Sequence, residues 1–416
     1  MKNYLFNLGK NAKKASLNIT SSKIKNKVLK DYMGLILNNH SKIIIENQKD
    51  LNNATKNKLK ENLIKRLLLD KKKLLEITKS IKTIISFKDP VDQILKGWKR
   101  PNGLKIEKKT IPIGVIAVIY ESRPNVTSDV AALCFKSGNP VILKGGSEAY
   151  YSNKILTNLF KKALQKNKVS KNYVQFIESK DRKTVDFLLT KMVNYVDVII
   201  PRGGKGLVKK VQGFSKIPVI GHLEGICHTY IDEKADLSMS KRITLNAKLR
   251  NTAICGATET ILIHEKVLNK FCNPILFNLE KNGCQIIGDK QINKFYKGKI
   301  TIAKESDWSK EYLGPIVSIK TVKNITEAIN HINRYGTMHT DAIITKNIKS
   351  AKKFLKEVKS SIAMHNTSTQ FADGGEFGFG GEIGISTNTL PPRGPVGLDQ
   401  LVSFKYQVSS NGKIRK

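Results

Sequence analysis

Short, continuously apolar runs alternate with helical segments in the middle of this chain, and this alternation constrains the fold most. The strand-like runs cover residues 115–120, 140–144, 195–200 and 217–220. The helical segments between them cover about residues 124–137, 148–166 and 204–211. Strands that are apolar on both faces are typical of a parallel sheet covered by helices on both sides. We therefore expect an α/β fold with a doubly wound parallel sheet.

The same alternation continues beyond Gly221 with a second set of strands. These runs cover residues 227–231, 259–264, 315–320, 341–345 and 361–365. A chain of 416 residues is long enough to bury more than one core. We expect N-terminal helices and a first sheet domain in residues 1–221, a second sheet domain in residues 222–386, and a C-terminal return in residues 387–416.

Two further segments read as strands that fit neither sheet. Residues 105–111 alternate apolar and basic side chains, and residues 400–406 form a second short run near the C-terminus. Exposed strand edges invite pairing with another chain. The segment of residues 105–111 is therefore a poor candidate for a free-standing edge strand.

The net charge of +39 at first suggests a nucleic-acid-binding protein, and we keep this as an alternative function. However, only 10 of the 73 basic residues are arginine, and the lysines are spread along the whole chain. Nucleic-acid readers favour arginine for bidentate contacts and aromatic residues for stacking. The charge pattern therefore favours solvated helix faces, and we expect no nucleic-acid partner.

The sequence gives no sign of a membrane, secretory or metal-binding protein. No apolar run approaches the roughly 20 residues of a membrane span, and the longest, residues 111–120, is broken by Pro112 and Gly114. The first residues lack a signal-peptide apolar block, so we expect a cytoplasmic protein. The five cysteines have no C-x-x-C spacing and the seven histidines form no H-E-x-x-H pair, so no metal site is expected.

Cys255 lies among small residues between a helical run and a strand-like run. Gly256 and Ala257 crowd its sulfur little, and backbone amides of such a loop can stabilise a developing oxyanion. The structural alternative is a small buried hydrophobic residue, which is the common role of a lone cysteine.

Two glycine-containing turns follow predicted strands and open helices, a setting that favours phosphate binding. The first contains Lys144 and Ser147, and the second contains Arg202, Gly203 and Gly204. Neither turn is a strict G-x-G-x-x-G, so ordinary tight turns remain the alternative. Two such turns in successive β-α units indicate one extended ligand across the strand ends.

The segment around Cys255, Ala-Ile-Cys-Gly-Ala-Thr-Glu-Thr, resembles the active-site segment of the gamma-glutamyl phosphate reductase family within the aldehyde dehydrogenase superfamily. Further blocks similar to this family occur in the same order at residues 120–127, 141–148, 200–206, 322–343 and 371–397. The resemblance implies two α/β domains and a flap, formed by residues 98–112 and the C-terminal strand, that joins a partner subunit. Leu401 and Phe404 would then be buried only in the resulting homo-oligomer. The resemblance also implies NADPH-dependent reduction of L-glutamyl 5-phosphate to L-glutamate 5-semialdehyde in proline biosynthesis.

The resemblance also implies roles for individual residues. Cys255 would be the nucleophile and Asn125 would stabilise the oxyanion. NADP(H) would be bound by Lys144, Ser147, Arg202, Gly203, Gly204 and Glu311. The substrate would be bound by Arg123 and Arg393, while Gln370 replaces an arginine that the family usually has in its Ser-Thr-Arg-Phe-like segment.

The family resemblance leaves two points open. A hydrolytic aldehyde dehydrogenase is the closest alternative among enzymes, but it needs a glutamate that acts as a base. In this chain the position of that base falls nearer His222 than Glu224. Both residues are therefore expected only to line the site. Association with glutamate 5-kinase, the source of the substrate, also remains open.

Overall fold

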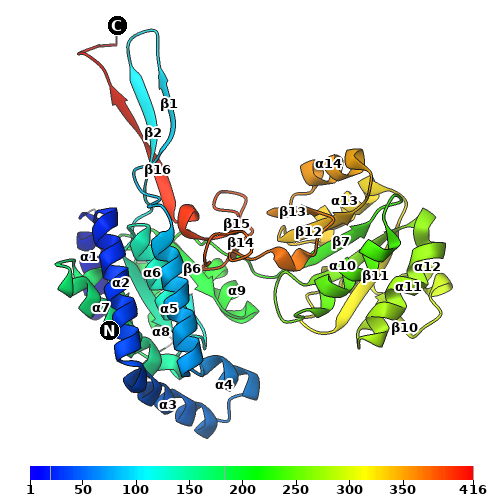
Figure 1. The fold of residues 1–416 in the computed structure, drawn as a ribbon, viewed down its shortest axis with the longest axis horizontal. Coiled ribbons are helices and arrows are strands. Elements are labelled where there is room, and N and C mark those ends of the chain that lie inside the picture. Colours follow the sequence, from blue (N-terminus) through cyan, green and yellow to red (C-terminus); the bar gives the residue numbers. More distant parts are fainter. Residues whose placement is uncertain (19, 182, 416) are drawn as a thin grey trace. The chain divides into compact units, whose positions relative to one another are not determined.

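The computed structural model describes residues 1–18, 20–181 and 183–415 (Figure 1). The chain forms two compact units. Unit 1 contains Met1–Gly221, Gly378–Gly384 and Val396–Lys416, and unit 2 contains His222–Phe377 and Ile385–Pro395. Among the described residues, no helix combines the length and the apolar character that crossing a membrane requires.

Unit 1 is built on a parallel sheet of four strands in the order β5-β4-β3-β6. The strands are β3 (Ile116–Tyr120), β4 (Val141–Gly145), β5 (Val174–Phe176) and β6 (Val198–Arg202). Every residue of β3, β4 and β5 is buried. Tyr120 is in register with Gly145 and with Arg202, so the carboxyl ends of three strands share one edge.

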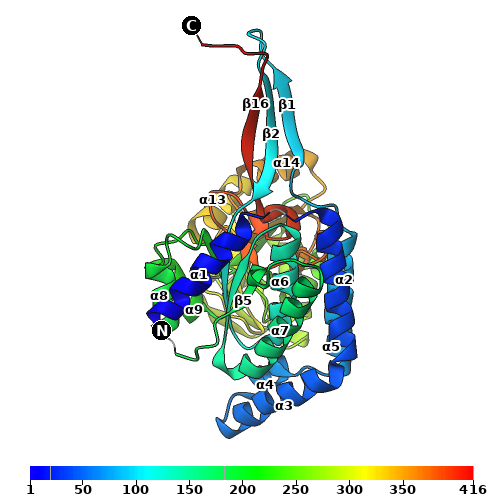
Figure 2. The same cartoon turned by 90° about the vertical axis from the view of Figure 1, so that its left-hand side faces the viewer.

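Helices cover both faces of this sheet (Figure 2). Ile116 and Val118 of β3 pack in one core, whereas Ala117 and Ile119 pack in another on the opposite face, as the two-residue period of a strand requires. The first face is covered by α2 (Ser22–Asn38), α5 (Lys71–Ser86), α6 (Pro124–Lys136) and α7 (Tyr150–Lys166). The second is covered by α1 (Lys2–Ser16), α8 (Lys183–Lys191) and α9 (Lys205–Phe214). The N-terminal helical region also contains α3 (His40–Lys56) and α4 (Glu61–Leu67).

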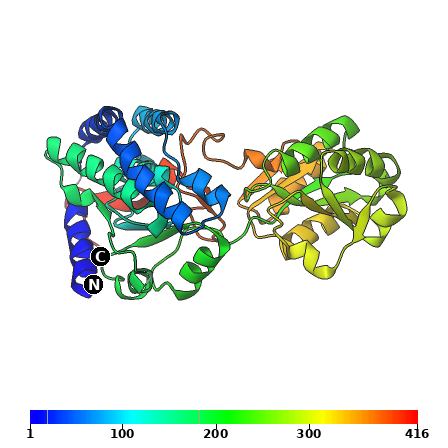
Figure 3. The same cartoon turned by 90° about the horizontal axis from the view of Figure 1, so that it is seen from below.

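Unit 2 contains a parallel sheet of seven strands in the order β10-β9-β11-β8-β7-β12-β13. The strands are β7 (Cys227–Ile231), β8 (Thr258–His264), β9 (Gln285–Gly288), β10 (Ile300–Ile302), β11 (Ile316–Val322), β12 (Thr340–Ile344) and β13 (Ile362–His365). One face packs on α10 (Leu237–Leu249) and α11 (Leu268–Lys281), with α12 (Lys290–Phe295) beside α11. The other packs on α13 (Ile325–Tyr335) and α14 (Ile348–Glu357) (Figure 3). The predicted class, α/β with helix-covered parallel sheets, is therefore confirmed.

Several predicted elements differ in detail from the observed ones. The expected strand at 217–220 forms only an isolated bridge between Val219 and Ile199, because its neighbour Pro218 has no amide hydrogen to donate. The sequence analysis also missed β5, α8, β9 and β10. The three strands have at most four residues each, which is too short for a periodic pattern to stand out.

The third sheet is the flap, which consists of β1 (Ile94–Lys99), β2 (Lys105–Pro112) and β16 (Val402–Ser409) in antiparallel pairing. The expectation for Leu401 is wrong: this side chain is fully buried within unit 1, and its carbonyl accepts a hydrogen bond from Asn139 at 2.8 Å. Phe404, in contrast, is 45% exposed. A small two-stranded sheet, β14 (Ile385–Ser386) with β15 (Gly394–Pro395), completes the fold.

Gly114 fixes the entry into β3 and is the residue we select to test this packing. Its φ of +130° lies in the region that favours glycine. A Cβ at this position would lie 2.1 Å from Oδ2 of Asp197. That carboxylate accepts the Val115 amide at 2.7 Å and the Lys13 ammonium at 2.7 Å, which ties α1 to the sheet.

We predict that Gly114→Ala lowers the free energy of unfolding by at least about 2 kcal/mol, because it adds backbone strain and displaces Asp197. Urea unfolding followed by circular dichroism measures this change. Gly34→Ala is the control, since Gly34 lies in α2 with open space around it and should gain about 0.5–1 kcal/mol. Equal stabilities of the two variants would contradict the account.

Candidate active site

Cys255 lies in the loop between α10 and β8, next to the amino end of β8. Of the five cysteines it is the one that is partly exposed, whereas Cys134, Cys227, Cys272 and Cys284 are buried. Burial raises the pKa of Cys272 and of Cys284 to about 12, and it also raises the pKa of Cys134 and of Cys227. These four sulfurs therefore remain protonated thiols at neutral pH, and the buried alternative for Cys255 does not apply.

The backbone of the Cys255 loop is held by close contacts from two other segments. Gly225 approaches so closely that a Cβ there would lie 2.0 Å from the Cys255 carbonyl oxygen. The Cys227 thiol donates a hydrogen bond to the same oxygen at 3.1 Å. Glu311 accepts a hydrogen bond from the Gly225 amide at 2.8 Å. The predicted cofactor residue Glu311 therefore helps to position the segment on which the Cys255 loop rests.

Sequence reasoning missed a buried ion pair next to this loop. Lys248, at the end of α10, bonds to Glu259 of β8, and both side chains are fully buried. Burial raises the pKa of Glu259 to about 7, although the Lys248 charge acts in the opposite direction. The Leu313 amide also donates to Glu259 at 3.3 Å, which connects this pair to the segment carrying Glu311. A glutamate within a continuously buried strand was the signal that could have indicated the pair.

Gln370, which stands where the family usually has an arginine, is buried against α10. Its side-chain oxygen accepts a hydrogen bond from Nε of Arg250 at 2.8 Å, while its amide donates to the Ala247 carbonyl at 2.9 Å. An arginine could not accept the first bond. Gln370 borders a cavity of about 490 Å³ whose lining includes Arg242, Asn246, Arg250, Ser368 and Glu376.

Asn125 lies in the first turn of α6, after Arg123 at the N-cap and Pro124 at the first helical position. Asn125 is exposed, and its side-chain amide lies 3.3 Å from Oδ2 of Asp129, one turn further along the helix. Burial raises the pKa of Asp129 to about 6, although hydrogen bonds from Ser80 and Asn125 lower it. Arg123 is also exposed at the surface of this turn.

Lys144 and Ser147 lie at the carboxyl end of β4. Lys144 donates to the Gly145 carbonyl at 3.1 Å, and burial lowers the pKa of its ammonium group. Ser147 donates to Glu148 at 3.4 Å, and Glu148 in turn accepts the Ser122 hydroxyl at 2.5 Å. Sequence reasoning did not identify Glu148, which holds this turn to the segment after β3.

Arg202, Gly203 and Gly204 connect β6 to the N-terminus of α9. The Gly204 amide donates to Oε2 of Glu121 at 2.8 Å, and Arg202 lies 3.6 Å from the Glu382 carboxylate. The Glu121 carboxylate therefore occupies the position that an anionic ligand takes at a helix N-terminus. In unit 1, parallel pairing thus gathers the predicted residues of both turns, with Arg123 and Asn125, at one edge of the sheet.

Among the described residues, no hydrogen bond or ion pair connects Arg393 to the Cys255 loop. It is exposed beside β15, and its guanidinium donates to the Lys359 carbonyl at 2.6 Å. The predicted substrate role of Arg393 therefore has no support from its observed partner.

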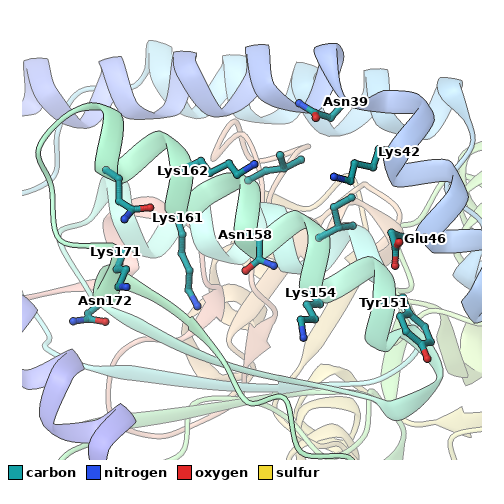
Figure 4. Close-up of a pocket in the computed structure, with 13 residues that line it drawn as sticks. Asn39, Lys42, Glu46, Tyr151, Lys154, Asn158, Lys161, Lys162, Lys171 and Asn172 are labelled. Carbon is teal, nitrogen blue, oxygen red and sulfur yellow. The ribbon is translucent and has the colours of Figure 1, made fainter.

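Another cavity, of about 570 Å³, lies in unit 1 between α3 and α7 (Figure 4). Lysines dominate its charged lining, with Lys42, Lys154, Lys161, Lys162 and Lys171 around it. None of the predicted site residues lines this cavity, so we do not assign it to the active site.

Comparisons with known proteins identify the family of this chain. A model of the aldehyde dehydrogenase family matches residues 34–285 and 301–395. Gamma-glutamyl phosphate reductases from Bartonella tribocorum and Brucella suis are 46% and 45% identical over 96% and 98% of this chain, and the matches cover 98% and 97% of those proteins. The chain therefore belongs to the aldehyde dehydrogenase family and, within it, to the gamma-glutamyl phosphate reductases.

Solved structures support the same assignment. The crystal structure of gamma-glutamyl phosphate reductase from Thermotoga maritima superposes with a TM-score of 0.96 at 38% identity, covering 99% of this chain and 100% of that chain. An acetylating aldehyde dehydrogenase from Geobacillus thermoglucosidasius has a TM-score of 0.67 at 16% identity, covering 100% of this chain and 98% of that chain, and shows the shared fold. Membership of this family implies a nicotinamide cofactor.

The raised pKa of Asp129, which lies beside Asn125 on α6, makes the free energy of unfolding depend on pH. Its pKa of about 6 in the folded state exceeds the ordinary value of 3.8. Between these two values the folded state retains a proton that the unfolded state has lost. This group therefore makes the free energy of unfolding fall as the pH rises from about 4 to about 6, and the loss persists above pH 6.

We predict that Asp129→Asn removes this loss and raises the free energy of unfolding at pH 8 by about 1–3 kcal/mol relative to the native chain, with a smaller gain at pH 4. Urea unfolding across this pH range measures the difference. Asp186→Asn is the control, because Asp186 is an exposed carboxylate opposite Lys210. A gain that does not depend on pH would contradict the role assigned to Asp129.

Proposed function

We propose that this chain catalyses the NADPH-dependent reduction of L-glutamyl 5-phosphate to L-glutamate 5-semialdehyde and phosphate, a step of proline biosynthesis. The observation that carries the proposal is the partly exposed Cys255 within a loop fixed by Gly225, Cys227 and Glu311. Gamma-glutamyl phosphate reductases that are 45–46% identical over 96–98% of this chain support the choice of substrate.

The residues of unit 1 fit a phosphate-bearing cofactor. The amide of Gly204 already binds a carboxylate oxygen of Glu121, so the N-terminus of α9 can hold an anionic group once Glu121 moves aside. Lys144 and Ser147 would bind the adenosine end, together with Arg202 and Gly203 at the second turn. The preference for NADP over NAD is what the resemblance to gamma-glutamyl phosphate reductases implies. When bound, the reduced nicotinamide supplies a hydride to the acyl carbon, and Glu311 would bind its ribose.

Cys255 provides the nucleophile in the proposed mechanism. Its thiolate attacks the acyl carbon, and the bond from that carbon to the phosphate oxygen breaks, which releases phosphate and leaves a thioester. The negative charge on the tetrahedral carbonyl oxygen is stabilised by the Cys255 backbone amide and the Asn125 side-chain amide. After reduction, the thiohemiacetal on Cys255 collapses, which regenerates the thiolate and releases the semialdehyde. Arg123 and Arg393 are the proposed substrate contacts.

We predict that Cys255→Ala lowers the rate of phosphate-dependent NADP reduction by glutamate semialdehyde at least about 1,000-fold, because the covalent step is lost. The formation of NADPH, followed by its absorbance, measures the rate in this reverse direction, and NAD in place of NADP tests the cofactor preference. Cys284→Ala removes a buried thiol and should retain activity. Near-native turnover of Cys255→Ala would refute the mechanism.

We also propose that the flap joins subunits in a homo-oligomer. Its strands β1 and β16 are the two edges of the three-stranded sheet and carry exposed apolar side chains. Ile94, Leu95, Phe404, Tyr406 and Val408 are each 45–57% exposed. An edge strand of this composition favours pairing with another chain over exposure to water.

We predict that deletion of residues 402–416 converts the assembly into monomers and reduces activity, because it removes β16 but keeps the buried Leu401. Sedimentation velocity measures the assembly. Deletion of residues 410–416 alone is the control, since it leaves the whole of β16 in place. A full-length chain that sediments as an active monomer would show that the flap does not join subunits.

A further inference from the structure

The topology of unit 2 brings two histidines to the sulfur of Cys255. Strands β8, β7 and β12 are neighbours in the parallel sheet, so their amino ends lie at one edge. Cys255 precedes β8, His222 precedes β7, and His339 immediately precedes β12. One ligand atom from each of these three residues lies within 4.8 Å of the other two. The three residues are far apart in the sequence, which explains why no spacing motif indicated them.

The hydrogen bonds orient both imidazole rings. Nδ1 of His222 donates a hydrogen bond to the Ile385 carbonyl oxygen at 2.8 Å, which fixes the orientation of the ring. Nδ1 of His339 lies 2.9 Å from the Thr340 hydroxyl. His339 is fully buried, and its Nε2 has no hydrogen-bond partner among the described residues. A buried nitrogen without a partner is costly unless a ligand satisfies it.

We propose that Cys255, His222 and His339 form a binding site for Zn²⁺, with the fourth coordination position open to water or a small anion. One thiolate and two imidazoles are a ligand set that suits zinc, and the Ile385 carbonyl and the Thr340 hydroxyl are the outer-shell partners that orient zinc-binding histidines. Zn–S and Zn–N bonds of about 2.3 and 2.0–2.1 Å place tetrahedral ligand atoms about 3.3–3.6 Å apart, so the cluster contracts by roughly 1 Å on binding.

Zinc at this site inhibits the enzyme, and this consequence rests on the proposed function of Cys255. Binding releases the thiol proton and commits the sulfur lone pair to the metal, so the sulfur cannot attack the acyl phosphate. A chelator that removes the zinc ion reverses the inhibition.

Cys227 is the one other thiol close to this cluster, with its sulfur 3.6 Å from Nδ1 of His339. However, the Cys227 thiol donates a hydrogen bond to the Cys255 carbonyl, and its side chain is fully buried. Cys255, which is partly exposed, is therefore the thiolate ligand, and Cys227 is not.

The test is a titration of the full-length protein with ZnCl₂, without cofactor or substrate, by calorimetry and by competition with a chromophoric chelator. We expect one ion per chain. The affinity should fall more than about 100-fold in Cys255→Ser, His222→Asn and His339→Asn, which exceeds the usual effect of losing an outer-shell partner. The controls are His40→Asn, at an exposed histidine on α3, and Cys284→Ala, at a buried thiol outside the cluster, and both should bind zinc as the native chain does.

A second measurement keeps the proposal testable if the His339 variant fails to fold. Co²⁺ added to the native chain should give a thiolate-to-metal absorption band, and zinc should protect Cys255 from alkylation by iodoacetamide. Absence of stoichiometric binding, native affinity in Cys255→Ser, or a cobalt band that survives alkylation of Cys255 would each overturn the site. A different result would be zinc binding by the native chain together with full turnover by Cys255→Ala. That result would refute the catalytic role of Cys255 and leave the metal site intact.

Discussion

Parallel pairing of buried strands is the constraint that gathers the candidate functional residues within each unit. In a parallel sheet all strands run in one direction, so segments that follow, or precede, neighbouring strands meet at one edge. In unit 1 the carboxyl ends of β3, β4 and β6 gather the loops with Asn125, Lys144 and Arg202. In unit 2 the amino ends of β7, β8 and β12 gather Cys255 with two imidazole rings. Register thus brings together side chains that are distant in the sequence.

The buried charges of unit 2 follow from the same constraint. Glu259 lies on a strand covered on both faces, so its carboxylate cannot reach water, and Lys248 from the end of α10 compensates it. His228 and Asp341 form a buried hydrogen bond across the neighbouring strands β7 and β12, with 2.8 Å between the Nδ1 and Oδ1 atoms. Removing one member of either pair leaves a buried polar or charged partner without compensation, which costs more than the pair contributes. These pairs therefore fix the strand ends from which the Cys255 loop and the His339 segment begin.

The sequence predicted the architecture well and the contacts poorly, for physical reasons. Long apolar strands such as β3 and β4 were recognisable because burial on both faces demands continuous hydrophobicity. Short strands such as β5 and β10 were not, since three residues define no period. The position of Cys255 between a helix and a strand was predicted from its small neighbours. Its contacts with Gly225 and Cys227 depend on pairing between segments about 30 residues apart, which local patterns do not encode.

The isolation of one reactive thiol explains why a soft-metal site and a nucleophile coincide in this fold. Burial keeps four cysteines protonated and unreactive. A sulfur that attacks an acyl phosphate has to be accessible, so burial cannot protect it from other reagents. A sulfur that is open to substrate is also open to metal ions, and its affinity for them depends on which nitrogen donors the sheet places nearby. Here the amino ends of two neighbouring strands place the imidazoles of His222 and His339 beside this sulfur, and Nε2 of His339 has no hydrogen-bond partner among the described residues. The same register that exposes Cys255 to its substrate therefore supplies the ligands that could sequester it.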